Sequence, residues 1–206
     1  MHNKGVEAEP PVAILDFYGP KFFLDSFWSS PLPALAQIPD FDESFVNQIF
    51  NEPLLTSTAT SLEKASAAST GDGHSAPSST GSQKPRREPG MPKPDLSIPR
   101  NAWLFSALKH GTHLGKIVQD GNFDRVDPAS GFSATFPPTF FIHGAADALV
   151  LTRLSEQAYH KLKDLGVDTG LALVPGASHG FDSGLPEDDP KYAFVREGIT
   201  FLKNHV

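Results

Sequence analysis

The sequence predicts an α/β protein, with about three parallel strands flanked by helices. Three short apolar runs end in Gly-containing turns, at residues 12–18, 139–142 and 171–174. These runs do not alternate apolar with polar residues, which is typical of strands covered on both faces in a parallel sheet. An amphipathic segment at 152–165 separates the second run from the third, and a further segment of helical periodicity follows the third. Strand, helix, strand, helix in this order indicates α/β architecture.

Local signals predict where the helices begin and end. We expect Asp40 to cap a short helix, Asn101 to cap a longer one, and Gly166 to end the helix at 152–165. Asp189 and Pro190 are expected to cap and start the last helix. The residues expected on the buried faces of the last two helices are Leu154, Ala158, Leu162 and Leu165, then Val195, Ile199, Leu202 and Val206.

Composition changes along the chain and predicts its organisation. Residues 1–11 are expected to form an N-terminal tail. At about 64–96 the chain is rich in Ser, Gly and Pro, and the middle of this stretch holds no side chain large enough to pack. Such a segment cannot offset the entropy lost on ordering, so a disordered insert is predicted there.

The overall composition narrows the function classes. The chain has 206 residues, 39% of them hydrophobic, with no cysteine and a formal net charge of -7. The missing cysteines exclude disulfides, thiol nucleophiles and thiolate metal sites. The net negative charge argues against nucleic acid or an anionic membrane as partner, and no run approaches membrane-spanning length. A cytoplasmic protein without metal or cofactor is expected. His110 and His113 could be taken for a metal-binding pair, but no third ligand stands at a spacing typical of metal sites, so a solvated helix end is favoured for them.

Two polar residues follow the second and third predicted strands. Asp147 comes after the strand at 139–142, and His179 comes after the strand at 171–174. The right-handed crossover rule makes these strands parallel and brings both residues to the carboxyl edge of the sheet, where open α/β sheets place their sites. An acid and a histidine are two members of an acyl-transfer triad. Asp147 as a simple turn residue and His179 as a surface histidine remain alternatives.

The two motifs that carry these residues resemble a known family. The motif His-Gly-x-x-Asp at 143–147 is followed by Gly-Ala-Ser-His-Gly-Phe at 176–181. Together with the strand and turn at 13–20, they resemble the C-terminal part of the α/β-hydrolase fold, and within it the esterase/lipase-like group. The resemblance implies that Asp147 is the triad acid and His179 the base. It also implies that residues 12–20 and 139–206 form the C-terminal half of the hydrolase domain, with residues 21–138 as a cap-like insertion.

The nucleophile of this family is not found in the chain. The family places its Gly-x-Ser-x-Gly elbow and its oxyanion loop before the strand that residues 12–18 resemble. Only Ser75 stands in a partial imitation of the elbow, and that stretch lacks a preceding apolar strand. We therefore expect the C-terminal portion of a carboxylic-ester hydrolase that is inactive alone, with a small ester substrate once a missing N-terminal half completes it. The alternatives are a non-catalytic binding or interaction module and a hydrolase that uses Ser75, Ser178 or Ser183.

Two residues interrupt the apolar strands. His143 is expected to form a hydrogen bond at a strand end rather than to act chemically, and Asp16 to be a strand-end carboxylate that needs partners. The bare edge of the first strand predicts self-association, because exposed apolar edges pair with other chains.

Overall fold

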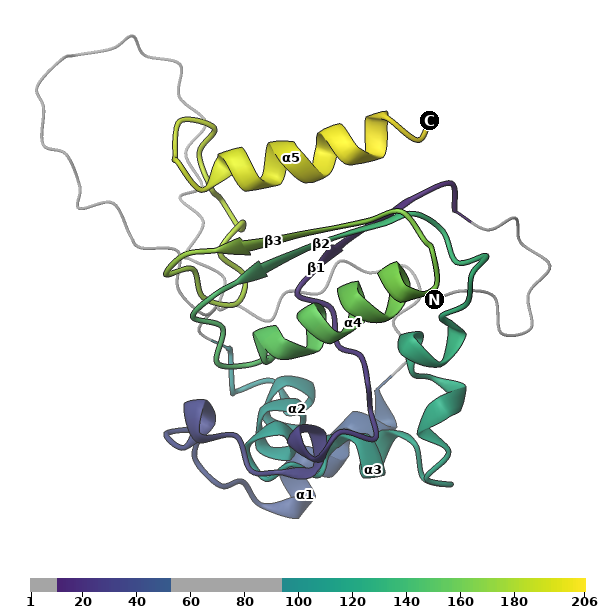
Figure 1. The fold of residues 1–206 in the computed structure, drawn as a ribbon. Coiled ribbons are helices and arrows are strands. Elements are labelled where there is room, and N and C mark those ends of the chain that lie inside the picture. The colour runs from purple at the N-terminus through teal and green to yellow at the C-terminus, as the bar shows by residue number, and fades with distance from the viewer. Residues whose placement is uncertain (1–10, 53–93) are drawn as a thin grey trace, which may run out of the picture.

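The computed structural model describes residues 11–52 and 94–206, and it contains a three-stranded parallel sheet (Figure 1). The strands are β1 (Ile14–Phe17), β2 (Thr139–Gly144) and β3 (Thr169–Val174), in the order β1-β2-β3. Ile14 pairs with Thr139, and Thr139 pairs with Thr169, so all three strands run in register toward the same edge. This arrangement confirms the predicted fold class.

Two helices cover the two faces of the sheet. Helix α4 (Thr152–Asp164) lies on one face and α5 (Tyr192–Lys203) on the other (Figure 1). Because successive side chains of a strand point to opposite faces, Phe140 and Ile142 of β2 pack toward α5, whereas Phe141 packs toward α4. His143 is therefore expected on the α4 side of the sheet.

A layer of short helices lies beyond α4. It contains α1 (Glu43–Val46), α2 (Pro99–Lys109) and α3 (His113–Ile117), on the side of α4 that faces away from the sheet (Figure 1). Trp28 packs with Leu154 of α4 and so joins this layer to the helix. The described residues also form five 3₁₀ helices: Ser26–Ser29, Pro33–Leu35, Asn47–Asn51, Phe123–Arg125 and Pro128–Gly131.

Several predicted helix details are wrong. Asp40 does not cap α1, because its carboxylate accepts hydrogen bonds from Lys109 and His110, and the residue before α1 is Asp42. Asn101 does not cap α2: Pro99 starts that helix, and the Asn101 amide donates to the Asp95 carbonyl from within its first turn.

The buried stripes are confirmed in part. Leu154, Ala158 and Leu162 of α4 are fully buried, but Leu165 is 37% exposed because the helix has already ended there. Val206 is 98% exposed, past the end of α5. In α5, Phe194, Val195 and Phe201 pack against the core. The helix begins at Tyr192 after Lys191, so the predicted cap and start at Asp189 and Pro190 are wrong.

The predicted insert at 64–96 lies outside the described residues except for its last three positions. One of them, Leu96, packs against the apolar cluster around Phe105. The predicted cap at 21–138 is described only at its two ends. No helix within the described ranges is both long enough and apolar enough to cross a bilayer.

Candidate active site

Asp147 stands in the turn that follows β2, where backbone groups hold its carboxylate. One oxygen, Oδ1, accepts hydrogen bonds from the backbone N–H groups of Leu149 and Val150, at 2.8 and 2.9 Å. The turn-residue interpretation of Asp147 is thus correct for this oxygen. The other oxygen, Oδ2, is left for side chains.

The turn after β2 and the turn after β3 are joined directly. Ala145 N–H donates to the Val174 carbonyl and Ala146 N–H donates to the Ala177 carbonyl, both at 2.9 Å. Gly144 allows this approach, because a Cβ at this position would collide with the Ala177 carbonyl. The two turns therefore form one rigid rim at the carboxyl edge of the sheet.

His179 lies on this rim with its ring against Asp147. Its Nδ1 is 2.8 Å from Asp147 Oδ2, and because a carboxylate only accepts, Nδ1 carries the proton. The neutral ring then has an unprotonated Nε2 that can accept a proton. The side chain of His179 is 26% exposed, whereas that of Asp147 is fully buried.

The surroundings of Asp147 keep it ionised. Burial raises the pKa of Asp147, but hydrogen bonds from His143, His179 and two backbone N–H groups lower it by more. The net result is a pKa well below the usual value for an aspartate. Asp147 is a carboxylate at neutral pH and can stabilise a cationic His179.

Tyr18 holds the loop that carries His179. Its ring lies 4.4 Å from the His179 ring, and its hydroxyl donates to Asp182 Oδ1 at 2.6 Å. Burial and the Asp182 hydrogen bond raise the pKa of Tyr18, so the hydroxyl stays protonated. Tyr18 has a φ of 42°, in the left-handed region that favours glycine, which is a strain often found at functional sites.

A second imidazole contacts the same carboxylate from the buried side. His143 Nε2 is 3.2 Å from Asp147 Oδ2 and 2.9 Å from the Val150 carbonyl, and its Nδ1 is 2.7 Å from Ser155 Oγ. Lys21 Nζ then lies 3.2 Å from Ser155 Oγ. Although Ser155, His143 and Asp147 are a serine, a histidine and an aspartate in contact, Ser155 is 0% exposed and no substrate reaches it.

Two predicted strand residues have the partners that were expected. His143 does form hydrogen bonds at the end of β2. Asp16 is paired with Lys21 at 3.2 Å and accepts a hydrogen bond from Gly19 N–H at 2.7 Å. The sequence interpretation missed Lys21 and Ser155, although Ser155 stands next to Leu154 on the buried stripe of α4 and so offered a signal.

The three serines considered as alternative nucleophiles differ in where they lie relative to His179. Ser178 precedes His179 in the chain, Ser183 lies in the turns that follow, and Ser75 is outside the described residues. Among residues 11–52 and 94–206, no hydrogen bond joins a serine hydroxyl to His179 Nε2. His110 contacts Asp40, and across the described ranges no three His, Asp or Glu side chains gather as metal ligands.

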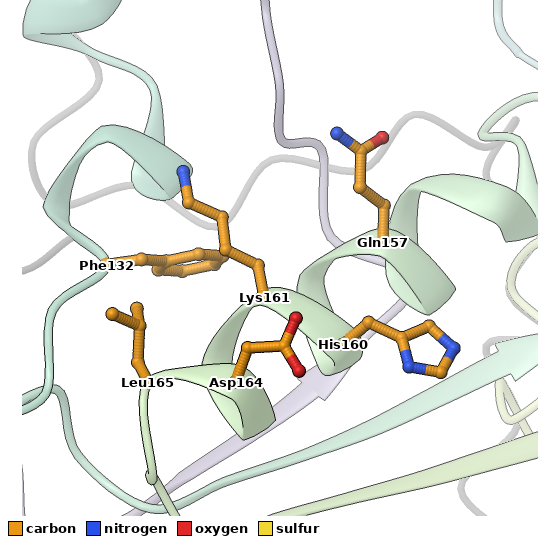
Figure 2. Close-up of a pocket in the computed structure, with 6 residues that line it drawn as sticks. All are labelled: Phe132, Gln157, His160, Lys161, Asp164 and Leu165. Carbon is orange, nitrogen blue, oxygen red and sulfur yellow. The ribbon is translucent and has the colours of Figure 1, made fainter.

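An open groove of about 650 Å³ lies on the other side of α4 (Figure 2). Figure 2 shows Gln157, Lys161 and Asp164 projecting from the outer side of α4, with Phe132 opposite Lys161. Ser155 and Ala158 of the same helix are buried. The groove is therefore separated from the rim by the helix itself.

The sequence is similar to stretches of fungal polyketide synthases. It is 30% identical over 210 residues to a non-reducing polyketide synthase, ausA, of Aspergillus calidoustus, covering 96% of this chain and 8% of the synthase. It is 26% identical over 220 residues to the synthase adrD of Penicillium rubens, with the same coverage of each chain. The chain thus spans less than a tenth of the length of these relatives. No family model matches the chain.

The parallel order of the strands and the Asp147–His179 contact at their carboxyl edge agree with the resemblance to the α/β-hydrolase fold that the sequence motifs carry. The three-stranded parallel sheet with a helix on each face matches an incomplete α/β-hydrolase-like fold.

Solved esterases are among the structural neighbours of this chain. An esterase of Thermogutta terrifontis is 26% identical, with a TM-score of 0.36 over 39% of this chain and 29% of the esterase. A truncated carbohydrate esterase from gut microbiota is 23% identical, with a TM-score of 0.33 over 40% of this chain and 27% of that protein.

Proposed function

We propose that this chain supplies the acid and the base of an acyl-transfer site that hydrolyses carboxylic esters. One observation carries the proposal: His179 Nδ1 donates to the buried Asp147 carboxylate at 2.8 Å, while the side chain remains partly exposed. In this arrangement Nε2 takes a proton from an attacking hydroxyl and later returns it to the leaving group. Asp147 orients the ring and stabilises its cationic form.

The nucleophile and the oxyanion donors come, in this proposal, from outside the chain. The chain matches only 8% of the polyketide synthases that it resembles, which supports a role as one piece of a larger catalytic protein. Those relatives also suggest the substrate, an ester of a polyketide acid. The outer edge of β1, which within the described residues pairs only with β2, is where a further strand would add.

The proposed setting is cytoplasmic. The sequence contains no cysteine, which suits a reducing compartment, and its formal net charge of -7 disfavours nucleic acid as partner.

An ester-hydrolysis assay tests the proposed function. We expect no turnover of a short-chain aryl ester by the chain alone. We expect turnover when the chain replaces the matched stretch of the Aspergillus calidoustus synthase. In that chimera, His179→Ala should lower kcat by about 10⁴-fold or more, because removing a triad member leaves only residual catalysis.

His205→Ala is the matched control for this assay. His205 also contacts a carboxylate, Asp168, at 3.0 Å, but near the C-terminus and away from the rim, so its replacement should leave the rate unchanged. Full activity in the His179→Ala chimera would refute the proposal. Turnover by the chain alone would instead place the nucleophile within it, and an inactive chimera would favour the non-catalytic binding module.

A further inference from the structure

Two imidazoles share one oxygen of Asp147, and the structure treats them differently. His179 contacts Oδ2 at 2.8 Å from the partly exposed side, and His143 contacts the same atom at 3.2 Å from a fully buried position. If His143 carried a positive charge, it would neutralise Asp147 and weaken its effect on His179. The charge state of His143 therefore matters for the proposed base.

The proton on Nε2 of His143 is fixed by its two neighbours. Nε2 lies 2.9 Å from the Val150 carbonyl and 3.2 Å from Asp147 Oδ2, and both of these oxygens are acceptors at neutral pH. An unprotonated Nε2 would face two acceptors with no proton between them. Nε2 must therefore carry a hydrogen.

Ser155 decides whether the other ring nitrogen also carries one. Ser155 Oγ lies 2.7 Å from His143 Nδ1 and 3.2 Å from Lys21 Nζ, and these are its two hydrogen-bond partners among the described residues. Lys21 Nζ can only donate, so the hydroxyl accepts from it and gives its own proton to Nδ1. A proton on Nδ1 would leave the buried hydroxyl proton without an acceptor, which is unfavourable.

Lys21 is itself held in place. It is 1% exposed, and its ammonium is paired with Asp16 Oδ2 at 3.2 Å. The pKa of Lys21 is lowered by burial, which outweighs the opposite effect of Asp16 and Asp127. The direction of the hydrogen bonds thus runs from Lys21 through Ser155 and His143 to Asp147. The titratable side chains that face His143 from the elements around it are Asp147, His179, Tyr18 and, through Ser155, Lys21.

We propose that Lys21 and Ser155 are positioning residues of this site. Together they hold the His143 ring neutral, with its single proton on Nε2. Asp147 then keeps its full negative charge for His179. This inference rests on the proposed function, since it assigns the role of base to His179 alone, but its test needs no turnover.

Nitrogen NMR of the whole chain, labelled with ¹⁵N, tests the inference directly. The ¹⁵N shifts of an imidazole distinguish protonated from unprotonated ring nitrogens. In the unmodified protein at neutral pH we expect His143 to have an unprotonated Nδ1 and a protonated Nε2. A protonated Nδ1 of His143 would overturn the inference.

Two variants interrupt the hydrogen bonds from Lys21 through Ser155 to His143 at different points. Ser155→Ala deletes only one buried hydroxyl, and Lys21→Met with Asp16→Asn removes both charges of the ion pair without leaving one alone. Both variants remove the constraint on Nδ1 but keep the two acceptors of Nε2, so we expect part of the His143 population to carry a proton on Nδ1 as well as on Nε2. We also expect the Nδ1 proton resonance of His179 to move upfield, as its hydrogen bond to Asp147 weakens.

The control is Lys161→Met, on the outward side of the same helix (Figure 2). It should leave both histidine spectra unchanged. If Ser155→Ala folds and also leaves both spectra unchanged, the two residues serve only packing and the inference fails. The two proposals can fail separately. If the histidine spectra are as expected but the chimera with the synthase hydrolyses no ester, the proposed function is rejected and the assignment of His143 stands.

Discussion

The two sides of Asp147 differ in almost every physical respect. On the α4 side, His143, Ser155 and Lys21 are buried and linked by hydrogen bonds in one direction. On the α5 side, His179 stands in a loop, is partly exposed and makes its hydrogen bond through Nδ1. One carboxylate thus joins a closed polar chain to an accessible ring.

This difference separates two tasks that a catalytic acid–base pair requires. The closed side fixes the position and the charge of the carboxylate, since buried polar groups tolerate few alternative arrangements when all are paired. The open side leaves the other ring nitrogen of His179 available to a substrate. Substitutions on the closed side should therefore alter the stability of the protein and the charge at Asp147. Substitutions on the open side should alter the order of the loop that carries His179.

The largest effect is expected for Asp147→Asn, which removes the group that both sides share. The amide cannot accept from both histidines with the strength of a carboxylate, and we expect a loss of about 3 kcal/mol in the free energy of unfolding. Because the pKa of Asp147 is lowered in the folded state, its stabilisation is present above the unfolded pKa of about 4 and is lost as the pH falls below it. Urea unfolding between acid and neutral pH measures both effects.

Asp40→Asn is the matched control for this acid titration. Asp40 also has two side-chain partners, Lys109 and His110, and its pKa is also lowered, mainly by the hydrogen bond from Lys109. It is exposed to solvent, however, so the variant should keep the acid dependence of the unmodified protein. An Asp147→Asn protein with an unchanged acid dependence would show that the closed side does not depend on this charge.

A smaller effect is expected where the two sides meet, at Gly144. In Gly144→Ala the new methyl group would collide with the Ala177 carbonyl, which cannot move away because it accepts from Ala146. We expect a loss of roughly 1–3 kcal/mol in the free energy of unfolding, as for other overpacked sites. Gly115→Ala in α3 meets no atom within 4 Å and should instead raise stability by up to about 1 kcal/mol. Equal effects of the two changes would mean that the turns are not held close together.

The sheet could be predicted from the sequence because its signals are local. Each strand is a continuous apolar run, and the crossover rule gave the parallel order that the register confirms. The ends of α1 and α2 could not be predicted in the same way. Asp40 has a polar side chain before a helical segment, but its tertiary partners Lys109 and His110 compete for it.

The open side of the site was predictable, whereas on the closed side the hydrogen bonding of His143 was predicted but Lys21 and Ser155 were not. Asp147 and His179 stand directly after predicted strands, so the topology alone brings them to one rim. Lys21 reaches Ser155 across 134 positions of sequence, and no spacing rule connects them. Lysine side chains are rarely buried, so the sequence alone suggests that Lys21 is exposed to solvent.

The smallest effect concerns the open side alone and tests whether Tyr18 holds the His179 loop. Tyr18→Phe keeps the ring beside His179 but removes the hydrogen bond to Asp182, and we expect a loss of about 1 kcal/mol. Because Asp182 anchors the loop, amide hydrogen exchange at 179–183 should become faster while that of β2 stays unchanged. Tyr159→Phe is the control, since its hydroxyl contacts only the exposed Lys163 among the described residues and its loss should leave the loop as it is. Unchanged hydrogen exchange in Tyr18→Phe would mean that the contacts with the turn after β2, and not Tyr18, keep the loop ordered. The position of His179, like the charge of its partner Asp147, would then depend on the buried side of the site.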